Sequence, residues 1–217
     1  MPKSWFLRLL FAAIAVVAVM LVWRVWALSH AYSGVADVPP GMIAGPEHAD
    51  LTVTMLFDYQ CPYCHKAYPI LLDAAKRDGR VRIALRPIAA NGVDIVPRMA
   101  VAANLQGKFL DFHDALMLVE PPLNEDVCRE ASNKLGLNWT KMQFEAKSQT
   151  TKAFLDQGLD LAVKLGINST PTFILGQIVY TPQGSMPTAT DFLRLFDEAR
   201  RGSAAPALPS APASQTQ

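Results

Sequence analysis

Two cysteines, Cys61 and Cys64, are separated only by Pro62 and Tyr63. A pair with this spacing can cycle between a dithiol and a disulfide, because one thiolate attacks a disulfide and the second thiol resolves the mixed disulfide. We expect Cys61 to be the exposed nucleophile, since unpaired N–H groups and the dipole at a helix N-terminus stabilise an anion. Cys64, one turn further along, should be more buried and act as the resolving thiol. Pro62 and Tyr63 should tune the thiolate and therefore the reduction potential.

The same cysteine pair could instead be half of a metal site, or an inert pair in the core. A structural zinc site needs four ligands, often from a second pair. The rest of the chain offers only Cys128 and four isolated histidines, so we expect no metal and no other cofactor. Pro62 and the change from strand to helix at this point argue against an inert pair. Cys128 shares a helical face with apolar residues and should be a buried thiol.

Two strands and a helix should position the cysteines. Residues 51–57 form an apolar run that predicts a buried strand. A helix should then begin at the cysteines, with Pro62 in its first turn, and end at Gly79. Residues 80–86 alternate apolar and polar side chains, which predicts a second strand that ends at Pro87. Together they form a βαβ unit.

A helical block and a second group of strands follow. The expected helices are 95–106, 108–118, 125–135 and 139–165. The last of these contains Gly158, near which it could kink or split. Strand character returns at 172–175 and 178–180, which predicts a hairpin, and a final amphipathic helix is expected at 191–200. The order is therefore β-α-β, a helical block at about residues 93–166, and β-β-α.

The N-terminal segment, residues 1–28, should insert into a membrane. Its run from Leu9 to Trp23 contains no charge, glycine or proline. The run alone is shorter than the about 20 residues that a full span requires. Counting from Trp5, with Arg8 reaching the headgroups, makes the length sufficient. We expect a single helix from about Trp5 to Trp26.

The charges that flank this segment favour an exported domain, because Lys3 and Arg8 outweigh Arg24. The protein would then span the inner membrane once, with its catalytic domain in the periplasm or another extracytoplasmic space. The alternative is a signal peptide cleaved near Ser29-His30-Ala31, which would leave a soluble periplasmic protein. Arg24 and two tryptophans just before this site argue against cleavage. Both interpretations place the domain where disulfides persist.

The remaining segments complete the expected organisation of the 217-residue chain. Residues 29–49 are rich in Gly, Pro and Ala and should form a flexible linker that spans roughly 25 Å. Residues 50–201 should form the catalytic domain. Residues 202–217 are rich in Ala, Pro and Ser and should be disordered. A net charge of +1 gives no electrostatic reason to expect nucleic-acid binding.

A proline just before a strand is the second notable feature, in Ser169-Thr170-Pro171-Thr172-Phe173. Together with Phe57-Asp58-Tyr59-Gln60-Cys61-Pro62-Tyr63-Cys64, this segment resembles the DsbA-like branch of the thioredoxin superfamily. The resemblance runs from about Ile43 to Arg201. It implies an α/β, thioredoxin-like fold with an inserted helical domain. It also implies that Pro171 is cis beside the cysteines, and that Thr170 offers backbone groups to an extended substrate peptide.

The predicted activity is that of a thiol–disulfide oxidoreductase that introduces disulfides into exported proteins with cysteines. The resemblance implies a DsbB-like membrane partner that reoxidises the pair. Strongly oxidising members carry His where this chain has Tyr63, so a disulfide isomerase or reductase kept reduced by a membrane electron donor is an alternative. A tethered binding module or chaperone with incidental cysteines is an alternative of another class.

Two side chains near the cysteines have open roles. Asp58 could accept a proton from Cys64, or it could cap the turn. His65 could stabilise a thiolate, or it could lie on the solvent face of its helix.

Overall fold

The computed structural model of the chain describes residues 3–89 and 95–203. Its centre is a five-stranded sheet with the order β1-β3-β2-β4-β5. The strands are β1 (Ile43–Ala44), β2 (Leu51–Phe57), β3 (Val81–Pro87), β4 (Thr172–Leu175) and β5 (Ile178–Tyr180). Strands β2 and β3 are parallel, and the other neighbours are antiparallel. The sheet and the helices along the chain occur in the expected order, with β1 as an addition.

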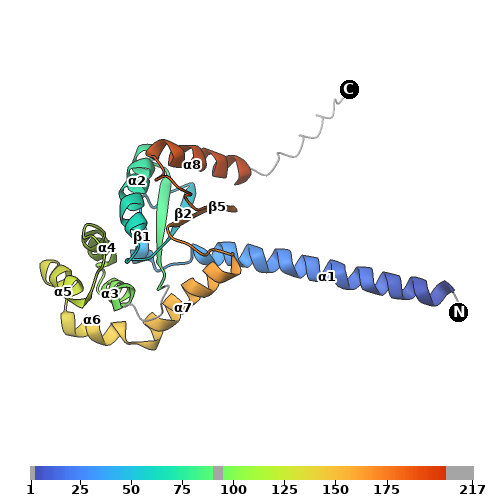
Figure 1. The fold of residues 1–217 in the computed structure, drawn as a ribbon, viewed down its shortest axis with the longest axis horizontal. Coiled ribbons are helices and arrows are strands. Elements are labelled where there is room, and N and C mark those ends of the chain that lie inside the picture. Colours follow the sequence, from blue (N-terminus) through green and yellow to red (C-terminus); the bar gives the residue numbers. More distant parts are fainter. Residues whose placement is uncertain (1–2, 90–94, 204–217) are drawn as a thin grey trace, which may run out of the picture.

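Helices cover both faces of this sheet (Figure 1). They are α1 (Lys3–Val35), α2 (Pro62–Asp78), α3 (Ile95–Asn104), α4 (Phe109–Met117), α5 (Glu125–Lys134), α6 (Trp139–Ala146), α7 (Gln149–Lys164) and α8 (Ala189–Ser203), with a short 3-10 turn at Pro40–Met42. Val53 and Met55 face the larger core, which α2 and α8 complete. Leu56 and Ile174 point to the opposite face, where α7 and the last turn of α1 pack.

The helices that follow the cysteines differ from expectation at one break. α2 ends at Gly79, whose φ of 76° gives the left-handed cap expected there. The long helix expected at 139–165 splits at Ser148, whose hydroxyl accepts the N–H of Thr151 and caps α7. Gly158 lies inside α7 instead, where a Cβ would make ordinary van der Waals contact with the Pro87 carbonyl oxygen at 3.5 Å and with the Arg86 side chain at 3.6 Å.

The structure also differs from the flexible linker expected at 29–49. α1 continues to Val35, which is completely buried, and Met42 is completely buried as well. Ile43 and Ala44 then pair with β3 at the edge of the sheet. Apolar side chains with sites in the core therefore fix a segment whose composition resembles that of a linker.

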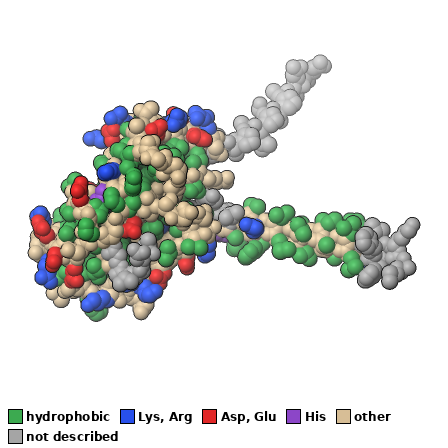
Figure 2. Space-filling view, viewed as in Figure 1, with side chains coloured by type: hydrophobic (Ala, Val, Ile, Leu, Met, Phe, Trp, Pro, Cys, Tyr) green, Lys and Arg blue, Asp and Glu red, His purple; other side chains and the backbone are tan. Residues whose placement is uncertain are grey.

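α1 is longer than the expected helix from Trp5 to Trp26. In the described part of the chain, one helix is long and apolar enough to cross a membrane, over Arg8–Ala27 (20 residues), and none of this stretch is buried. Figure 2 shows α1 as an extended, largely hydrophobic arm that leaves the folded domain. At the other end, α8 continues to Ser203, and residues 204–217 of the expected tail lie outside the described residues.

Candidate active site

The two cysteines lie at the start of α2, where the chain leaves the central strand β2. Cys61 is the N-cap residue, and Pro62 occupies the first turn, where no N–H is needed. The backbone N–H of Cys64 donates to the Cys61 carbonyl at 2.9 Å. Cys64 is completely buried and Cys61 is half-buried, and neither forms a disulfide. The structure thus exposes Cys61 and shields Cys64, as the spacing predicts.

The two thiols have opposite acidities. The pKa of Cys61 is lowered to about 5. The largest cause is the hydrogen bond that the Cys64 thiol donates to the Cys61 sulfur. Hydrogen bonds from the Thr170 side chain and from the backbone of Cys64 and Tyr63 lower it further, against the opposing effect of burial. Burial raises the pKa of Cys64 far above its ordinary value, and its hydrogen bond to Cys61 adds to this rise. At neutral pH the pair therefore holds one thiolate nucleophile and one thiol.

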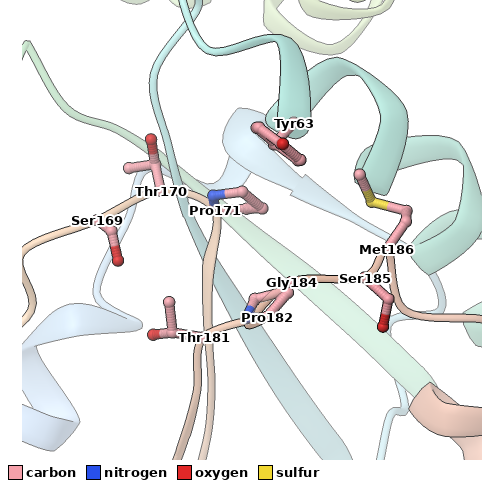
Figure 3. A pocket seen from close by; sticks show the side chains of 9 residues that line it. All are labelled: Tyr63, Ser169, Thr170, Pro171, Thr181, Pro182, Gly184, Ser185 and Met186. Atoms are coloured by element: carbon pink, nitrogen blue, oxygen red, sulfur yellow. The ribbon is translucent and has the colours of Figure 1, made fainter.

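The loop before β4 lies against this pair. The Thr170–Pro171 peptide bond is cis, and the Thr170 carbonyl oxygen lies 3.3 Å from Cys61 Sγ, close enough to accept the S–H when Cys61 is protonated. Tyr63, from α2, and the Thr170–Pro171 loop form one side of a pocket (Figure 3). The chain between β5 and α8 forms the other side, with Thr181, Pro182, Gly184, Ser185 and Met186. The pocket lies next to the cysteines, because Tyr63 stands between them in the chain and Thr170 contacts Cys61.

Asp58 and His65 organise the loop before the cysteines. The Asp58 carboxylate accepts the N–H of Gln60 at 2.8 Å, and its carbonyl accepts the N–H of Cys61 at 3.1 Å. The His65 ring is not on a solvent face. Its Nε2 lies 2.8 Å from the Tyr59 carbonyl and its Nδ1 3.1 Å from the Met117 carbonyl.

The sequence did not indicate a second set of contacts, which ties the active-site loop to the helical domain. The Gln60 amide bonds to both backbone groups of Leu123, each at 2.9 Å. The Tyr59 hydroxyl lies 2.9 Å from His113 Nδ1. Burial lowers the pKa of His113 to about 3, with a smaller effect from His65, so its ring is neutral. Because the partners are more than 50 positions apart, no local pattern reveals them.

Cys128 is completely buried and forms no disulfide. Across residues 3–89 and 95–203, no three His, Cys, Asp or Glu side chains gather in a way that could hold a metal ion.

Solved structures share this fold. The chain is 30% identical to a thioredoxin-like oxidoreductase from Silicibacter pomeroyi, with a TM-score of 0.69 over 77% of this chain and 96% of that one. ScsC of Proteus mirabilis is 18% identical, with a TM-score of 0.66 over 90% of each chain. The thiol-disulfide exchange protein α-DsbA2 of Wolbachia pipientis is also 18% identical, with a TM-score of 0.64 over 82% of this chain and 96% of that one. The expected thioredoxin-like fold is confirmed.

Comparison of the sequence with known proteins identifies a family and shows a similarity to part of larger proteins. The family model described as Thioredoxin matches residues 37–193. The Na(+)/H(+) antiporter NhaA 3 of Salinispora tropica is 27% identical over 137 residues, which are 61% of this chain and 21% of the antiporter. The chain thus spans about a fifth of the length of this curated relative.

A cysteine pair at a helix start beside a cis-proline loop, on this fold, defines the class of thioredoxin-like thiol–disulfide oxidoreductases. The chain belongs to the thioredoxin family.

Proposed function

We propose that the protein introduces disulfides into exported proteins through the Cys61–Cys64 pair. The observation that carries this proposal is the stabilised Cys61 thiolate, with a pKa lowered to about 5 by its hydrogen bonds. Stabilising the thiolate stabilises the reduced pair, and a stable reduced form makes the corresponding disulfide a stronger oxidant.

The reaction begins with the oxidised protein. A substrate thiolate attacks Cys61 Sγ, the bond between Cys61 and Cys64 breaks, and Cys64 leaves and takes up a proton. A second substrate thiolate then attacks the substrate sulfur of the mixed disulfide and releases Cys61 as a thiolate. The substrate has lost two electrons and gained a disulfide, and the cysteine pair has gained the two electrons. The high pKa of Cys64 favours its protonated form after the first step, and the low pKa of Cys61 makes it a good leaving group in the second.

The substrate would lie in the pocket beside the cysteines. Its walls are the Thr170–Pro171 loop, Tyr63 and the chain before α8. An extended peptide could pair with the backbone of Thr170, in the manner of strand addition, and its cysteine would then lie near Cys61. Tyr63 is 61% exposed and offers an aromatic surface to that peptide. Pro62, by fixing the first turn of α2, keeps Cys61 at the helix N-terminus.

A second part of the proposal concerns location. The apolar 20-residue span of α1 supports a single-pass anchor in the inner membrane, with the catalytic domain outside the cytoplasm. A DsbB-like membrane partner would then accept the two electrons and regenerate the disulfide. If full-length protein stays with membranes during alkaline carbonate extraction, the anchor is supported. If a shortened, soluble form that begins near Ala31 or Tyr32 appears, the segment is a cleaved signal.

The direction of electron flow is tested by equilibrating the protein with glutathione buffers. We expect a reduction potential between about −120 and −200 mV, within the range of oxidants and isomerases. A value near −270 mV, typical of a cytoplasmic reductant, would overturn the oxidant proposal. Trapping the redox state in cells adds a second test, because a mostly reduced pair would favour the isomerase or reductase. The Cys61→Ala variant tests the binding-module alternative, which alone predicts an unchanged phenotype.

A further inference from the structure

The junction between α1 and the catalytic domain is fixed by a buried arginine. Arg86 is completely buried at the end of β3. Its Nε donates to the Val35 carbonyl at 2.9 Å, and its Nη2 donates to the carbonyls of Gly34, at 3.2 Å, and Asp37. These bonds reach carbonyls in the last turn of α1 and just beyond it, where the helix supplies few donors of its own. Because Val35 also packs in the same cluster as Leu161 of α7, the direction in which α1 leaves the domain is set.

The length of the apolar span locates the membrane surface relative to this junction. The 20 residues of Arg8–Ala27 extend about 30 Å at 1.5 Å per residue, which is the thickness of the hydrocarbon core. Ala27 therefore lies at the exported boundary. Trp23 and Trp26 are 64% and 59% exposed, at the depth where tryptophans concentrate in membrane proteins.

The last turn of α7 reaches the exported boundary of the hydrocarbon core as well. Leu161 lies against Gly34 of α1, and α7 then continues toward the membrane side, because Lys164 lines the same cleft as Ala27 and His30. Figure 1 shows the end of α7 next to the domain end of α1. A cleft of about 530 Å³ separates the two helices. Its walls are Trp23, Arg24, Trp26, Ala27 and His30 from α1 and Leu161 and Lys164 from α7.

The chemistry of this cleft matches an amphiphile with a negative head. Indole rings and aliphatic side chains form most of its wall, and Arg24 and Lys164 add two positive charges, one from each helix. Among the ion pairs of the described residues, none uses either of these cations. Trp26 makes an edge contact with the His30 ring at 4.3 Å, which orders the wall.

We propose that this cleft binds one anionic phospholipid, with its phosphate held by Lys164 and by Arg24, which reaches outward from within the span to the headgroups, and with its acyl chains running along Trp23 into the bilayer. The inference rests on the proposed membrane anchor. The lipid would hold the end of α7 at the membrane surface. Since the chain passes from Lys164 to the Thr170–Pro171 loop within a few residues, it would also hold this side of the active site at a defined height.

The test uses the full-length chain in nanodiscs that contain equal amounts of dioleoyl phosphatidylglycerol and dioleoyl phosphatidylethanolamine. Native mass spectrometry after release from the disc counts the lipids that remain bound. We expect one phosphatidylglycerol to be retained selectively. One cation near an anionic surface contributes about 1 kcal/mol, so the Lys164→Glu and Arg24→Gln variants should each lower this retention about fivefold or more. The Lys141→Glu variant, which changes an exposed lysine on α6, should retain lipid like the wild type.

Flotation with liposomes of the same two lipids separates this inference from the anchor. If the protein floats but retains both lipids equally, or if Lys164→Glu changes nothing, the lipid site is wrong and the anchor stands. If the protein does not float, the anchor is wrong and the lipid site falls with it.

Discussion

The acidity of Cys61 can be tested by changing only the thiol beside it. The largest single cause of its lowered pKa is the hydrogen bond from the Cys64 side chain. The Cys64→Ala variant removes this donor, whereas Cys64→Ser keeps a hydroxyl in the same place. A hydrogen bond to a charged group contributes about 1.5–3 kcal/mol, and one pH unit corresponds to about 1.4 kcal/mol. The titration midpoint of Cys61 should therefore rise from about 5 to about 6–7 in Cys64→Ala. It should stay nearer the wild-type value in Cys64→Ser.

The reaction rate at pH 7 is a poor measure of this change. At this pH a thiol of pKa 5 is about 99% thiolate, and one of pKa 9 is about 1% thiolate. The less basic thiolate is, however, about 60-fold less nucleophilic, because nucleophilicity falls with pKa at a Brønsted slope of about 0.45. The two effects nearly cancel at pH 7. At pH 5 the difference in thiolate fraction grows to several thousandfold, so the acid limb of the rate profile carries the information.

The assay is the rate at which Cys61 attacks a small symmetrical disulfide between pH 3.5 and 9. Wild-type protein, reduced beforehand, should give a midpoint near 5, and the two variants should separate as described. Circular dichroism should show that both variants fold like the wild type. Identical midpoints for Cys64→Ala and Cys64→Ser would refute the role of the hydrogen bond. A wild-type midpoint near 9 would refute the stabilised thiolate altogether and remove the main support for an oxidant.

Three further changes test the surrounding structure by urea unfolding of the full-length protein in detergent. Arg86→Met should lower the free energy of unfolding by about 3 kcal/mol, because it leaves the carbonyls of Val35 and Asp37 without the donor they have in the wild type. Its matched control, Arg82→Met, removes only one bond at the half-buried Thr52 hydroxyl and should cost about 1 kcal/mol or less. Ser148→Ala should cost about 1 kcal/mol, since it removes the N-cap of α7, and an unchanged stability would argue against this cap. His113 has a folded pKa of about 3 against an ordinary 6.5, so the stability from its neutral ring is complete above pH 6.5 and is lost as the pH falls toward 3. In His113→Phe, the acid slope should therefore be shallower by about 1.4 kcal/mol per pH unit, and an equal slope would show that another group causes it.

Much of the fold could be predicted because its central strands have strong local patterns. The bounds of β2, β4 and β5 agree with the expected 51–57, 172–175 and 178–180. Runs rich in β-branched and apolar residues, bounded by polar residues or glycine, identify such strands from the sequence alone. By contrast, β1 contains only two residues, too few for any alternation, and the composition around it resembles that of a linker.

The candidate site was predictable where its parts are local. The spacing of Cys61 and Cys64 and the proline before β4 are visible in the sequence, and the structure brings Cys61 Sγ within 3.3 Å of the Thr170 carbonyl. The contacts that join the active-site loop to the helical domain were not predictable. The Gln60 side chain forms hydrogen bonds with the backbone of Leu123, 63 positions away. Neither residue belongs to a sequence pattern that predicts this contact. Such contacts depend on how the helical domain packs, and packing is a property of the whole fold.

The fixed junction changes how a membrane tether would act. A flexible linker over residues 29–49 would let Cys61 explore roughly 25 Å, and partners at many heights could then react. Instead, Arg86 joins the end of α1 to the end of β3. Arg86 also pairs in register with Leu56, which shortly precedes Cys61, so the junction at Arg86 and the cysteines lie toward the same ends of strands β2 and β3. If α1 spans a membrane, the effective concentration of Cys61 is high for a partner whose cysteines lie at that one height. It falls steeply for partners elsewhere. A membrane-bound reoxidising partner fits this constraint, and substrates would have to reach the same height above the membrane.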